Sequence, residues 1–431
     1  MERVRLVTCR KPPTVDGLAQ AAAPPDAVAE GNLSWIGFGD EMVCFGQEQD
    51  LARFVERADR TRLAPREYPD PIEQWRLHVV VQKGRLFQRV HPEVAVLADR
   101  GRFLLVDMDP GEARRANTEG APCYTVRPLD TLAPAGASGR SWVTFESRDR
   151  AGARAPDEEI EKCLALLSRE TFEEDLRALV RLPTRLSTSA HYAAACDFAC
   201  QRLEALGYAT SRQEILVREL PSQNVVAWQD GAGAAPRGLV LVTAHLDSIN
   251  HEDNASMAPG ADDDGSGSAG VIAIARALKD HSGTHDLCFV LFGGEEQGLL
   301  GSRRFVAAMT PVDQARTRAV VNMDMIGTLN IPTPTVLLEG AALSQGVIDG
   351  LADAAATYTG LTVQTSLHPA NSDHVSFIEK GMPAVLTIEG ADSVNDEIHT
   401  ARDILDHINF DFALEILRMN TAFIAESIGR A

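Results

Sequence analysis

The sequence predicts an α/β protein: an α/β/α sandwich with a central, mostly parallel mixed sheet, plus a smaller N-terminal α+β domain. From residue 157 onward, short apolar runs alternate with longer helical patterns. This alternation is typical of parallel sheets whose connecting helices cover both faces. The first 128 residues instead contain strand-like runs with short helices between them, and a stretch rich in Ala, Gly, Ser, Pro and Arg follows. Such a composition indicates a linker.

The length of the chain agrees with this division. At 431 residues we expect about two to three domains. We expect an N-terminal α+β accessory or pro-domain-like unit over 1–128, a linker over 129–156 and a catalytic domain over 157–431. Two hypotheses remain open for the first unit: a pro-segment that assists folding or covers a site, or a permanent accessory or oligomerisation domain.

The N-terminal unit shows no catalytic constellation. His78 lies within an apolar run and His91 precedes a proline, so both are most simply packing or turn residues. Helical patterns cover 48–58 and 110–117. Strand character is found at 33–38, 41–46, 75–82, 84–90 and 101–108.

Helices open the second unit. An amphipathic pattern covers 157–170, and the next helix is expected over 171–182, with Thr171 and Glu174 in capping-box positions. A third helix follows Ser189 as its N-cap and ends before Gly207. Beyond it, strands are expected at 237–244, 287–293, 318–325 and 382–390, alternating with helices at 267–280, 298–309 and 343–359.

Composition and charge exclude several classes of protein. The formal net charge of −20 leaves no basic stripe to neutralise phosphates, which argues against a nucleic-acid partner. No apolar run reaches the roughly 18–20 residues of a membrane span, and no membrane partner is expected. The first residues lack the apolar core of a secretory signal. We therefore expect a cytoplasmic protein, or a secreted or periplasmic one whose signal has been removed.

The cysteines do not indicate a disulfide framework. There are seven, an odd number, scattered over a long chain. Cys196 and Cys200 are four residues apart in a helical pattern, so we expect them to pack on one helix face.

Unusual polar residues follow the predicted strands. His245 and Asp247 come directly after one strand, and Asp262, Asp263 and Asp264 stand before the next helix. Since ligands bind at the carboxyl ends of strands in such sheets, we expect these side chains to share one edge. Later loops on that edge add Glu295, Glu296, Asp324 and His399.

Each of these residues has an ordinary structural explanation by itself, but together they predict a metal centre. Several carboxylates at one edge repel one another unless a cation binds there. Imidazole and carboxylate ligands without thiolate suit zinc, with manganese or cobalt as substitutes. Because the set exceeds the three ligands of a mononuclear catalytic zinc, two zinc ions per chain sharing one carboxylate is the economical arrangement. An acidified water between them would still need a proton acceptor that is not a ligand.

The same residues resemble a known family. The motifs "HLDS", "APGADDDGSG", "EEQGLLGS", "NMDM", "NSDH" and "EIHT" occur in this order. They resemble the di-zinc aminopeptidases of peptidase clan MH (metallopeptidase family 28), most closely the bacterial leucyl aminopeptidase type. The resemblance extends from about Thr171 to the C-terminus and includes "RLSTSAHYAAACDF", but leaves the N-terminal unit outside.

The resemblance implies a role for each residue. His245 and Asp324 would hold one zinc, Glu296 and His399 the other, and Asp263 would bridge them. Asp247 would orient His245, and Glu295 would be the general base. A cis peptide bond between Asp263 and Asp264 is also implied.

One loop departs from the family pattern. The family has a tyrosine three residues before "SDH" that polarises the substrate carbonyl, and Pro369 occupies that position here. His368 is a candidate replacement donor, although a surface histidine is the simpler interpretation. The cysteine pair beside that tyrosine is absent, so the side-chain pocket differs. Met325, Phe377 and Ile398 are candidates to line this pocket, or are core residues.

The function expected from the resemblance is a zinc-dependent exopeptidase that removes N-terminal residues from peptides. The alternatives are a carboxypeptidase or deacylase of the same fold, and a glutaminyl cyclase, which uses a single zinc. The intact aspartate triplet with both histidines favours two metals and disfavours the cyclase. A non-enzymatic scaffold would be expected to have lost ligands or the base, and neither is missing.

Overall fold

The computed structural model describes residues 3–10, 33–39, 41–60, 65–68, 70–119, 123–129, 141–143, 145–148, 153–253, 257–281 and 283–429. The chain divides into two compact units, Met1–Asp149 and Arg150–Ala431. Much of the expected linker, 129–156, lies outside the described residues, so the boundaries at 128 and 157 stay predictions. Each unit is described by itself.

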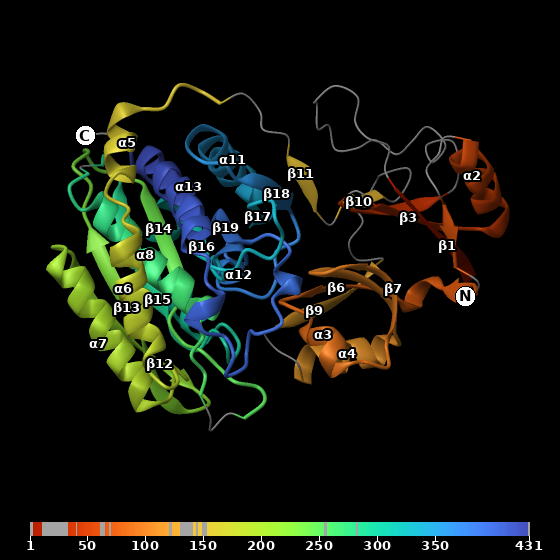
Figure 1. Ribbon diagram of the computed structural model, residues 1–431, viewed down its shortest axis with the longest axis horizontal. Helices are drawn as coiled ribbons and strands as arrows, with labels where there is room; N and C mark the ends of the chain where they lie inside the picture. The colour runs from red at the N-terminus through yellow and green to blue at the C-terminus, as the bar shows by residue number, and fades with distance from the viewer. Residues whose placement is uncertain are drawn as a thin grey trace. The chain divides into compact units, whose positions relative to one another are not determined.

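The N-terminal unit contains two sheets (Figure 1). The first has the order β10-β2-β3-β1-β4, with β5 also paired to β1, and helix α2 packs on β1. The second has the order β7-β8-β6-β9, with α4 packed on β9. The elements are β1 (Arg3–Arg10), β2 (Ser34–Phe38), β3 (Glu41–Gly46), α2 (Glu48–Arg60), β4 (Arg66–Glu67), β5 (Ile72–Glu73), β6 (Leu77–Gln82), α3 (Leu86–Val90), β7 (Ala95–Arg100), β8 (Phe103–Asp107), α4 (Pro110–Glu119), β9 (Tyr124–Pro128), β10 (Ser141–Val143) and β11 (Glu146–Arg148).

One predicted strand of this unit is wrong. The run 84–90 forms the short helix α3 after a turn, with Leu86 and Phe87 buried. The Gln82 side chain stabilises the turn, because its Oε1 accepts from Phe87 N–H (3.1 Å) and its Nε2 donates to Gly101 O (2.7 Å). A short apolar pair fits the period of a strand and of a helix equally well. Buried His78 lies in β6, where its Nδ1 is 2.9 Å from Arg76 O.

Capped helices begin the C-terminal unit. Helix α5 (Glu158–Leu164) is shorter than predicted. Helix α6 (Arg169–Val180) begins two residues before the predicted position, because Ser168 rather than Thr171 is its N-cap and accepts from Thr171 N–H. Helix α7 (Ala190–Ala205) confirms Ser189 as N-cap, since its Oγ accepts from Tyr192 N–H at 3.0 Å.

A large mixed sheet forms the centre of this unit, in the order β18-β17-β19-β16-β14-β15-β13-β12. The predicted strands β14, β15, β16 and β19 pair in parallel, whereas β12, β13 and β17, which were not predicted, add antiparallel pairs. The strands are β12 (Ala209–Val217), β13 (Leu220–Gln229), β14 (Leu239–His245), β15 (Asp286–Phe292), β16 (Thr317–Met323), β17 (Thr335–Glu339), β18 (Thr362–Ser366) and β19 (Ala384–Glu389). The helices are α8 (Gly267–Leu278), α9 (Leu300–Ala308), α10 (Pro311–Arg316), α11 (Gln345–Tyr358), α12 (His374–Ile378) and α13 (Phe410–Ile428).

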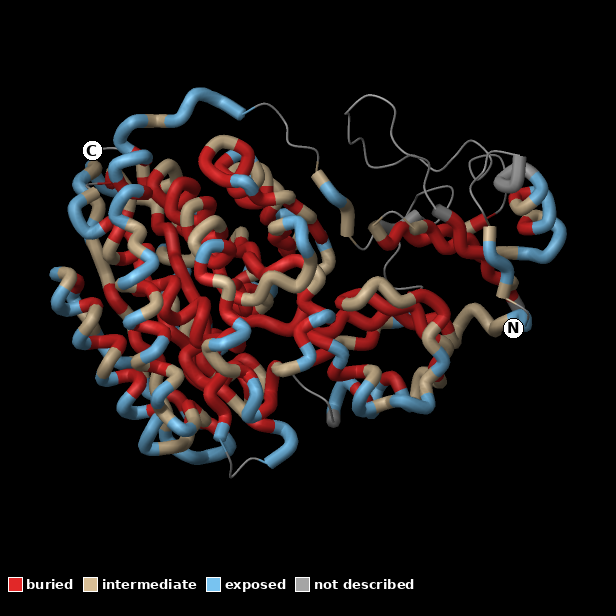
Figure 2. Tube along the Cα trace, in the orientation of Figure 1, coloured by how far each residue is buried: buried red, intermediate tan, exposed pale blue. Residues whose placement is uncertain are grey.

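Alternating side chains of β14 divide the core between the two faces of the sheet. Val240 and Val242 belong to the cluster that contains residues of α5–α8, α11 and α13. Leu239 and Leu241 belong to the other cluster, which α9 and α12 cover. The period of two in a strand buried on both faces produces this division. Figure 2 shows these strands as buried tubes inside a partly exposed helical layer. This confirms the predicted α/β/α sandwich.

Two further expectations concern the whole chain. All seven cysteines are free and buried, and Cys196 and Cys200 both belong to the core beneath α7. Within the described residues, every helix is too short or too polar to cross a membrane.

A buried carboxylate joins the helices α6, α7 and α8. Asp175 accepts from Arg276 Nη2 (2.7 Å) and lies 2.8 Å from Arg202 Nε. Its side chain is 1% exposed. We predict that Asp175→Ala lowers the free energy of unfolding by about 2 kcal/mol, because two charge-assisted contacts to a buried group are lost. The exposed pair Glu173–Arg177 in the same helix is the control, since Glu173→Ala should cost about 0.5 kcal/mol or less in urea unfolding. Equal effects would contradict the prediction.

Candidate metal centre

The structure brings the predicted ligand residues together at the carboxyl edge of the parallel strands. His245 is the last residue of β14, and Asp324 directly follows β16. Asp263 lies in the turn η3 (Ala261–Ser266) before α8. The pair Glu295–Glu296 follows β15, and His399 lies in the loop after β19. All of these side chains are buried. Their convergence follows from the parallel pairing of β14, β15, β16 and β19, because the loops at the ends of parallel strands meet at one edge.

The carboxylate of Asp263 lies between the two histidines. Its Oδ1 is 3.1 Å from His245 Nε2, and its Oδ2 is 3.0 Å from His399 Nε2. His399 Nε2 is also 3.0 Å from Glu296 Oε2, and His245 Nε2 is 3.6 Å from Asp324 Oδ1. One carboxylate therefore faces two separate imidazole–carboxylate pairs, as a shared ligand of two ions would.

Glu295 lies at the margin of this group. Its Oε2 is 4.0 Å from His245 Nε2, farther than the nearest oxygens of Asp263 and Asp324. Potential ligand atoms of His245, Glu295 and Asp324 nevertheless all lie within 4.8 Å of one another, as do those of His245, Asp263 and Glu296. The two adjacent glutamates thus have different surroundings, since Glu296 faces His399 and Glu295 faces His245.

Asp247 connects His245 with the glutamate loop. Its Oδ1 and Oδ2 accept from the backbone N–H groups of Glu295 and Glu296, each at 3.3 Å. His245 Nδ1 is 3.6 Å from Asp247 Oδ1 and 3.2 Å from the Asp247 carbonyl oxygen. The residue predicted to orient His245 therefore also fixes the backbone that carries both glutamates.

The structure adds one positioning group that the sequence analysis missed, Asp403, and gives a similar role to Asp264, which the sequence analysis named only as part of the aspartate triplet. Asp403 holds the aspartate turn, because its Oδ1 accepts from Asp262 N–H (2.9 Å) and its Oδ2 from Asp263 N–H (3.0 Å). Asp264 accepts from His245 N–H (3.1 Å) and Gly267 N–H (2.9 Å). Asp403 is four residues after His399 in the sequence, so an acid following the last histidine was the available signal.

His251 is another neighbour of the site that was not predicted. Its backbone N–H donates to His399 O (2.9 Å), and its ring centroid is 4.5 Å from that of His399. His399 has a φ of +57°, in the left-handed region that non-glycine residues rarely adopt. The contact with His251 helps to hold His399 in this conformation.

Buried negative charge dominates the electrostatics of the site. Burial lowers the pKa of His245, but Glu295 and then Asp247, Asp263 and Asp324 more than offset this, so the pKa is raised well above its usual value. Burial raises the pKa of Glu296. The carboxylates outnumber the bases that face them, and cations are the partners that would stabilise such a set. Nitrogen and carboxylate donors fit zinc, manganese or cobalt.

The remaining predictions from the family resemblance have mixed outcomes. The Asp263–Asp264 peptide bond is cis, as expected. Phe377 packs on Phe292 and Phe305 and belongs to the core. Met325 and Ile398 are buried, and the half-buried His368 stays a candidate donor.

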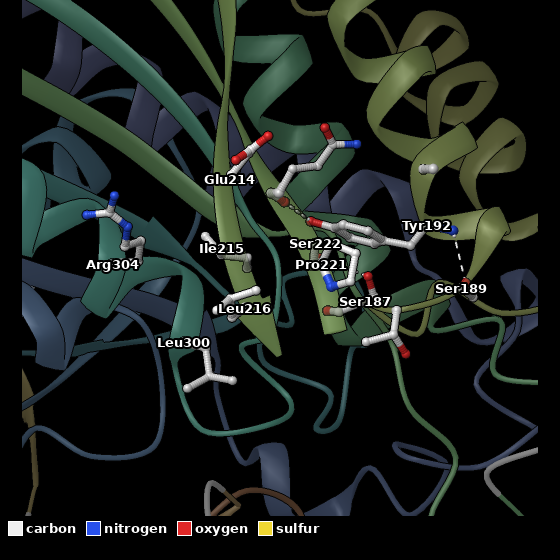
Figure 3. Close-up of a pocket in the computed structure, with 13 residues that line it drawn as sticks. Ser187, Ser189, Tyr192, Glu214, Ile215, Leu216, Pro221, Ser222, Leu300 and Arg304 are labelled. Carbon is white, nitrogen blue, oxygen red and sulfur yellow. Dashed lines mark hydrogen bonds between the residues drawn. The ribbon is translucent and has the colours of Figure 1, made fainter. Parts of the chain in front are cut away.

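A cavity is lined by the start of α7, the paired strands β12 and β13, and α9 (Figure 3). Its volume is about 780 Å³, and its wall includes Ser187, Tyr192, Glu214 and Arg304. Ser187 also contacts the loop that carries Glu295 and Glu296, because its Oγ accepts from Gly294 N–H at 2.6 Å. A hydrogen bond therefore joins the loop before Glu295 to the segment that precedes α7.

The fold and the buried centre define a class of protein: an α/β/α sandwich with a buried cluster of histidines and carboxylates at the carboxyl edge of its sheet. Comparison with known families gives the particular assignment. Residues 224–424 match the profile of Peptidase family M28, a family of clan MH.

Individual relatives agree with this assignment. A probable leucine aminopeptidase of Trichophyton verrucosum (strain HKI 0517) is 29% identical over 280 residues, covering 62% of this chain and 75% of the relative. The crystal structure of the LapA aminopeptidase of Legionella pneumophila has 19% identity and a TM-score of 0.57, over 82% of this chain and 99% of that one. A glutaminyl cyclase of Porphyromonas gingivalis shares the fold at 21% identity and a TM-score of 0.50, over 61% and 99% of the two chains.

Two buried carboxyl groups beside the site should make stability depend on pH. Asn395 Nδ2 donates to both Asp262 Oδ2 (2.9 Å) and Glu389 Oε1 (3.3 Å), which draws the two groups together. Burial and then repulsion from Asp262 raise the pKa of Glu389 well above its usual value of 4.5. The folded protein therefore retains a proton that the unfolded chain releases. The stability that this proton provides is complete below about pH 4.5 and is lost as the pH rises toward the folded pKa.

We predict that Glu389→Gln makes the pH dependence of stability shallower. The amide cannot ionise, so the fall of up to about 1.4 kcal/mol per pH unit that Glu389 contributes above its unfolded pKa should disappear. The measurement is urea unfolding of metal-free protein from pH 5 to pH 8. The control is Glu397→Gln. It removes an acid from the loop after β19, and the carboxylate of Glu397 pairs with exposed Arg402. A Glu389→Gln profile parallel to that of the parent would refute this prediction.

Proposed function

We propose that the chain is a zinc-dependent aminopeptidase of the M28 type, which holds two zinc ions and removes N-terminal residues from peptides. The observation that carries the proposal is the Asp263 carboxylate, whose two oxygens face His245 and His399 at 3.1 and 3.0 Å. The M28 match and the leucine aminopeptidase relatives support peptide bonds as the substrate class.

The ligand assignment follows the two halves of the cluster. His245 and Asp324 would hold one ion, Glu296 and His399 the other, and Asp263 both. Bound zinc would supply Lewis-acid polarisation of the substrate carbonyl and a lowered pKa for water. Manganese and cobalt ions accept the same donors and are expected substitutes.

Glu295 is the general base in this proposal. It is buried beside His245, but its Oε2 lies 4.0 Å from His245 Nε2, farther than the nearest oxygens of the proposed ligands Asp263 and Asp324. A carboxylate outside the ligand set can take a proton from the attacking water and return it to the leaving amine. Asp247 supports this step by accepting from the backbone N–H of Glu295, so the loop keeps its geometry while the side chain changes protonation.

The alternatives differ in the group beside the scissile bond. An aminopeptidase substrate carries a free ammonium group there, and the relatives named leucine aminopeptidase favour this alternative. A carboxypeptidase or deacylase substrate brings a carboxylate or a blocked nitrogen to the same place. A glutaminyl cyclase uses one zinc, whereas both halves of the cluster are intact here.

The two adjacent glutamates provide the sharpest test. We predict that Glu295→Ala keeps two bound zinc ions and loses about 10³-fold in kcat, because a general base contributes about 10²–10⁴-fold. Glu296→Ala should lose bound zinc, since it removes a ligand. Zinc content by elemental analysis and hydrolysis of an aminoacyl p-nitroanilide measure the two effects. Gln297→Ala, in the same loop, is the control and should keep both properties. Full activity of Glu295→Ala would show that the base is assigned wrongly.

A second test concerns the amino terminus of the substrate. We predict that the kcat/KM of leucyl p-nitroanilide is about 10-fold to 100-fold higher than that of its N-acetyl derivative. The N-acetyl derivative lacks the ammonium group, and one charge-assisted contact to that group contributes about 1.5–3 kcal/mol. Release of acetate from the N-acetyl compound faster than release of p-nitroaniline from leucyl p-nitroanilide would favour a deacylase, because a deacylase cleaves the acetyl–nitrogen bond and leaves the anilide intact.

A further inference from the structure

Arg185 is a buried cation under the proposed metal centre. It lies in the loop between α6 and α7, and its side chain is fully buried. Among the described residues of the C-terminal unit, it is the only buried lysine or arginine. A buried guanidinium is costly unless its donors are satisfied, so its surroundings indicate what it does.

The donors of Arg185 are directed to the two loops that carry ligands. Its Nε donates to Leu246 O (2.8 Å), the residue directly after the proposed ligand His245. Its Nη2 donates to Gly260 O (2.8 Å), and its Nη1 donates to Pro259 O. Both carbonyls belong to the turn that leads into Asp263. One planar guanidinium thus joins the end of β14 to the aspartate turn.

The backbone around Arg185 reinforces this connection. Arg185 N–H donates to Ser248 Oγ (3.0 Å), and Ser248 Oγ donates to Ala258 O (2.7 Å). Ser187, two residues later, accepts from Gly294 N–H (2.6 Å) in the loop of the two glutamates. The segment 183–187 therefore contacts all three loops that bring His245, Asp263 and Glu295–Glu296 into the site.

The packing leaves little freedom for other arrangements. Gly260 has a φ of +53°, and a Cβ there would lie 2.5 Å from Asp263 O and 3.0 Å from Arg185 Nη2. The aspartate turn is thus in close contact with the guanidinium. Burial lowers the pKa of Arg185, and the carboxylates of Asp403, Asp264, Asp247 and Asp263 oppose this effect by favouring its charged form. The guanidinium is a fixed positive charge beneath a group of buried negative ones.

We propose that Arg185 is a positioning residue for the metal ligands: it fixes the loops carrying His245 and Asp263 so that their side chains are preorganised for zinc. The identity of the ion rests on the proposed function, but the positioning does not depend on which peptide is cleaved. Lysine cannot replace it fully, because one ammonium group lacks the planar fork of donors that reaches three carbonyls.

The test compares zinc affinity in Arg185→Lys, Arg185→Met and the parent, with free zinc set by chelator buffers. We expect Arg185→Met to bind zinc about 100-fold more weakly and Arg185→Lys about 10-fold, as for other groups that orient metal ligands. At limiting zinc, hydrolysis should fall in parallel, and excess zinc should restore much of it. A third variant, Arg185→Ala, tests the guanidinium group directly: we expect millimolar guanidinium in solution to restore the zinc affinity of this variant.

The matched control is Arg276→Met, which removes a partly buried arginine that pairs with Asp175 away from the site. It should lower thermal stability without changing zinc affinity or responding to guanidinium. If Arg185→Ala does not fold, Ser248→Ala weakens the same connection without removing a charge and should also reduce zinc affinity.

Unchanged zinc affinity in Arg185→Lys and Arg185→Met would overturn the proposal. So would a loss of affinity that merely follows the loss of stability, as in Arg276→Met. A parent that binds two zinc ions but cleaves no peptide would refute the proposed function and leave this test intact.

Discussion

The constraint on which the structure depends is the concentration of buried carboxylates at one edge of a parallel sheet. Asp263, Glu295, Glu296 and Asp324 meet there because the loops after parallel strands converge. Their mutual repulsion is tolerable only if hydrogen bonds and positive charge offset it. Much of the local structure can be understood as meeting that requirement.

Backbone N–H groups and one buried guanidinium group meet this requirement. Backbone N–H groups satisfy Asp247, Asp264 and Asp403, and each of these bonds also fixes a loop that carries a proposed ligand. Arg185 adds a permanent positive charge below the turn of Asp263. The acids that surround the centre are therefore structural elements, and removing one should affect metal binding and folding together. This coupling explains why variants must be compared by zinc affinity as well as by rate.

The fold was largely predictable where hydrophobic patterns were long. The strands β14, β15, β16 and β19 are continuous apolar runs bounded by polar loops, and their alternation with helices indicated a parallel sheet. Strands β12 and β17 were missed because their apolar pattern is short or interrupted. The run 84–90 was assigned to the wrong class, since its turn is stabilised by Gln82 from outside the segment.

By itself, the sequence determined the chemistry: which histidines and carboxylates exist, their order, and their position after predicted strands. Motif order alone was enough to indicate the peptidase family and the proposed ligand set. Only the tertiary structure decided how these residues are held. It showed that Asp263 lies between the two histidines, that Asp247 binds the glutamate backbone, and that Arg185 joins two ligand loops. The physical reason is that residue types fix which interactions a chain can make, whereas hydrogen bonds between loops far apart in sequence exist only after the strands have paired.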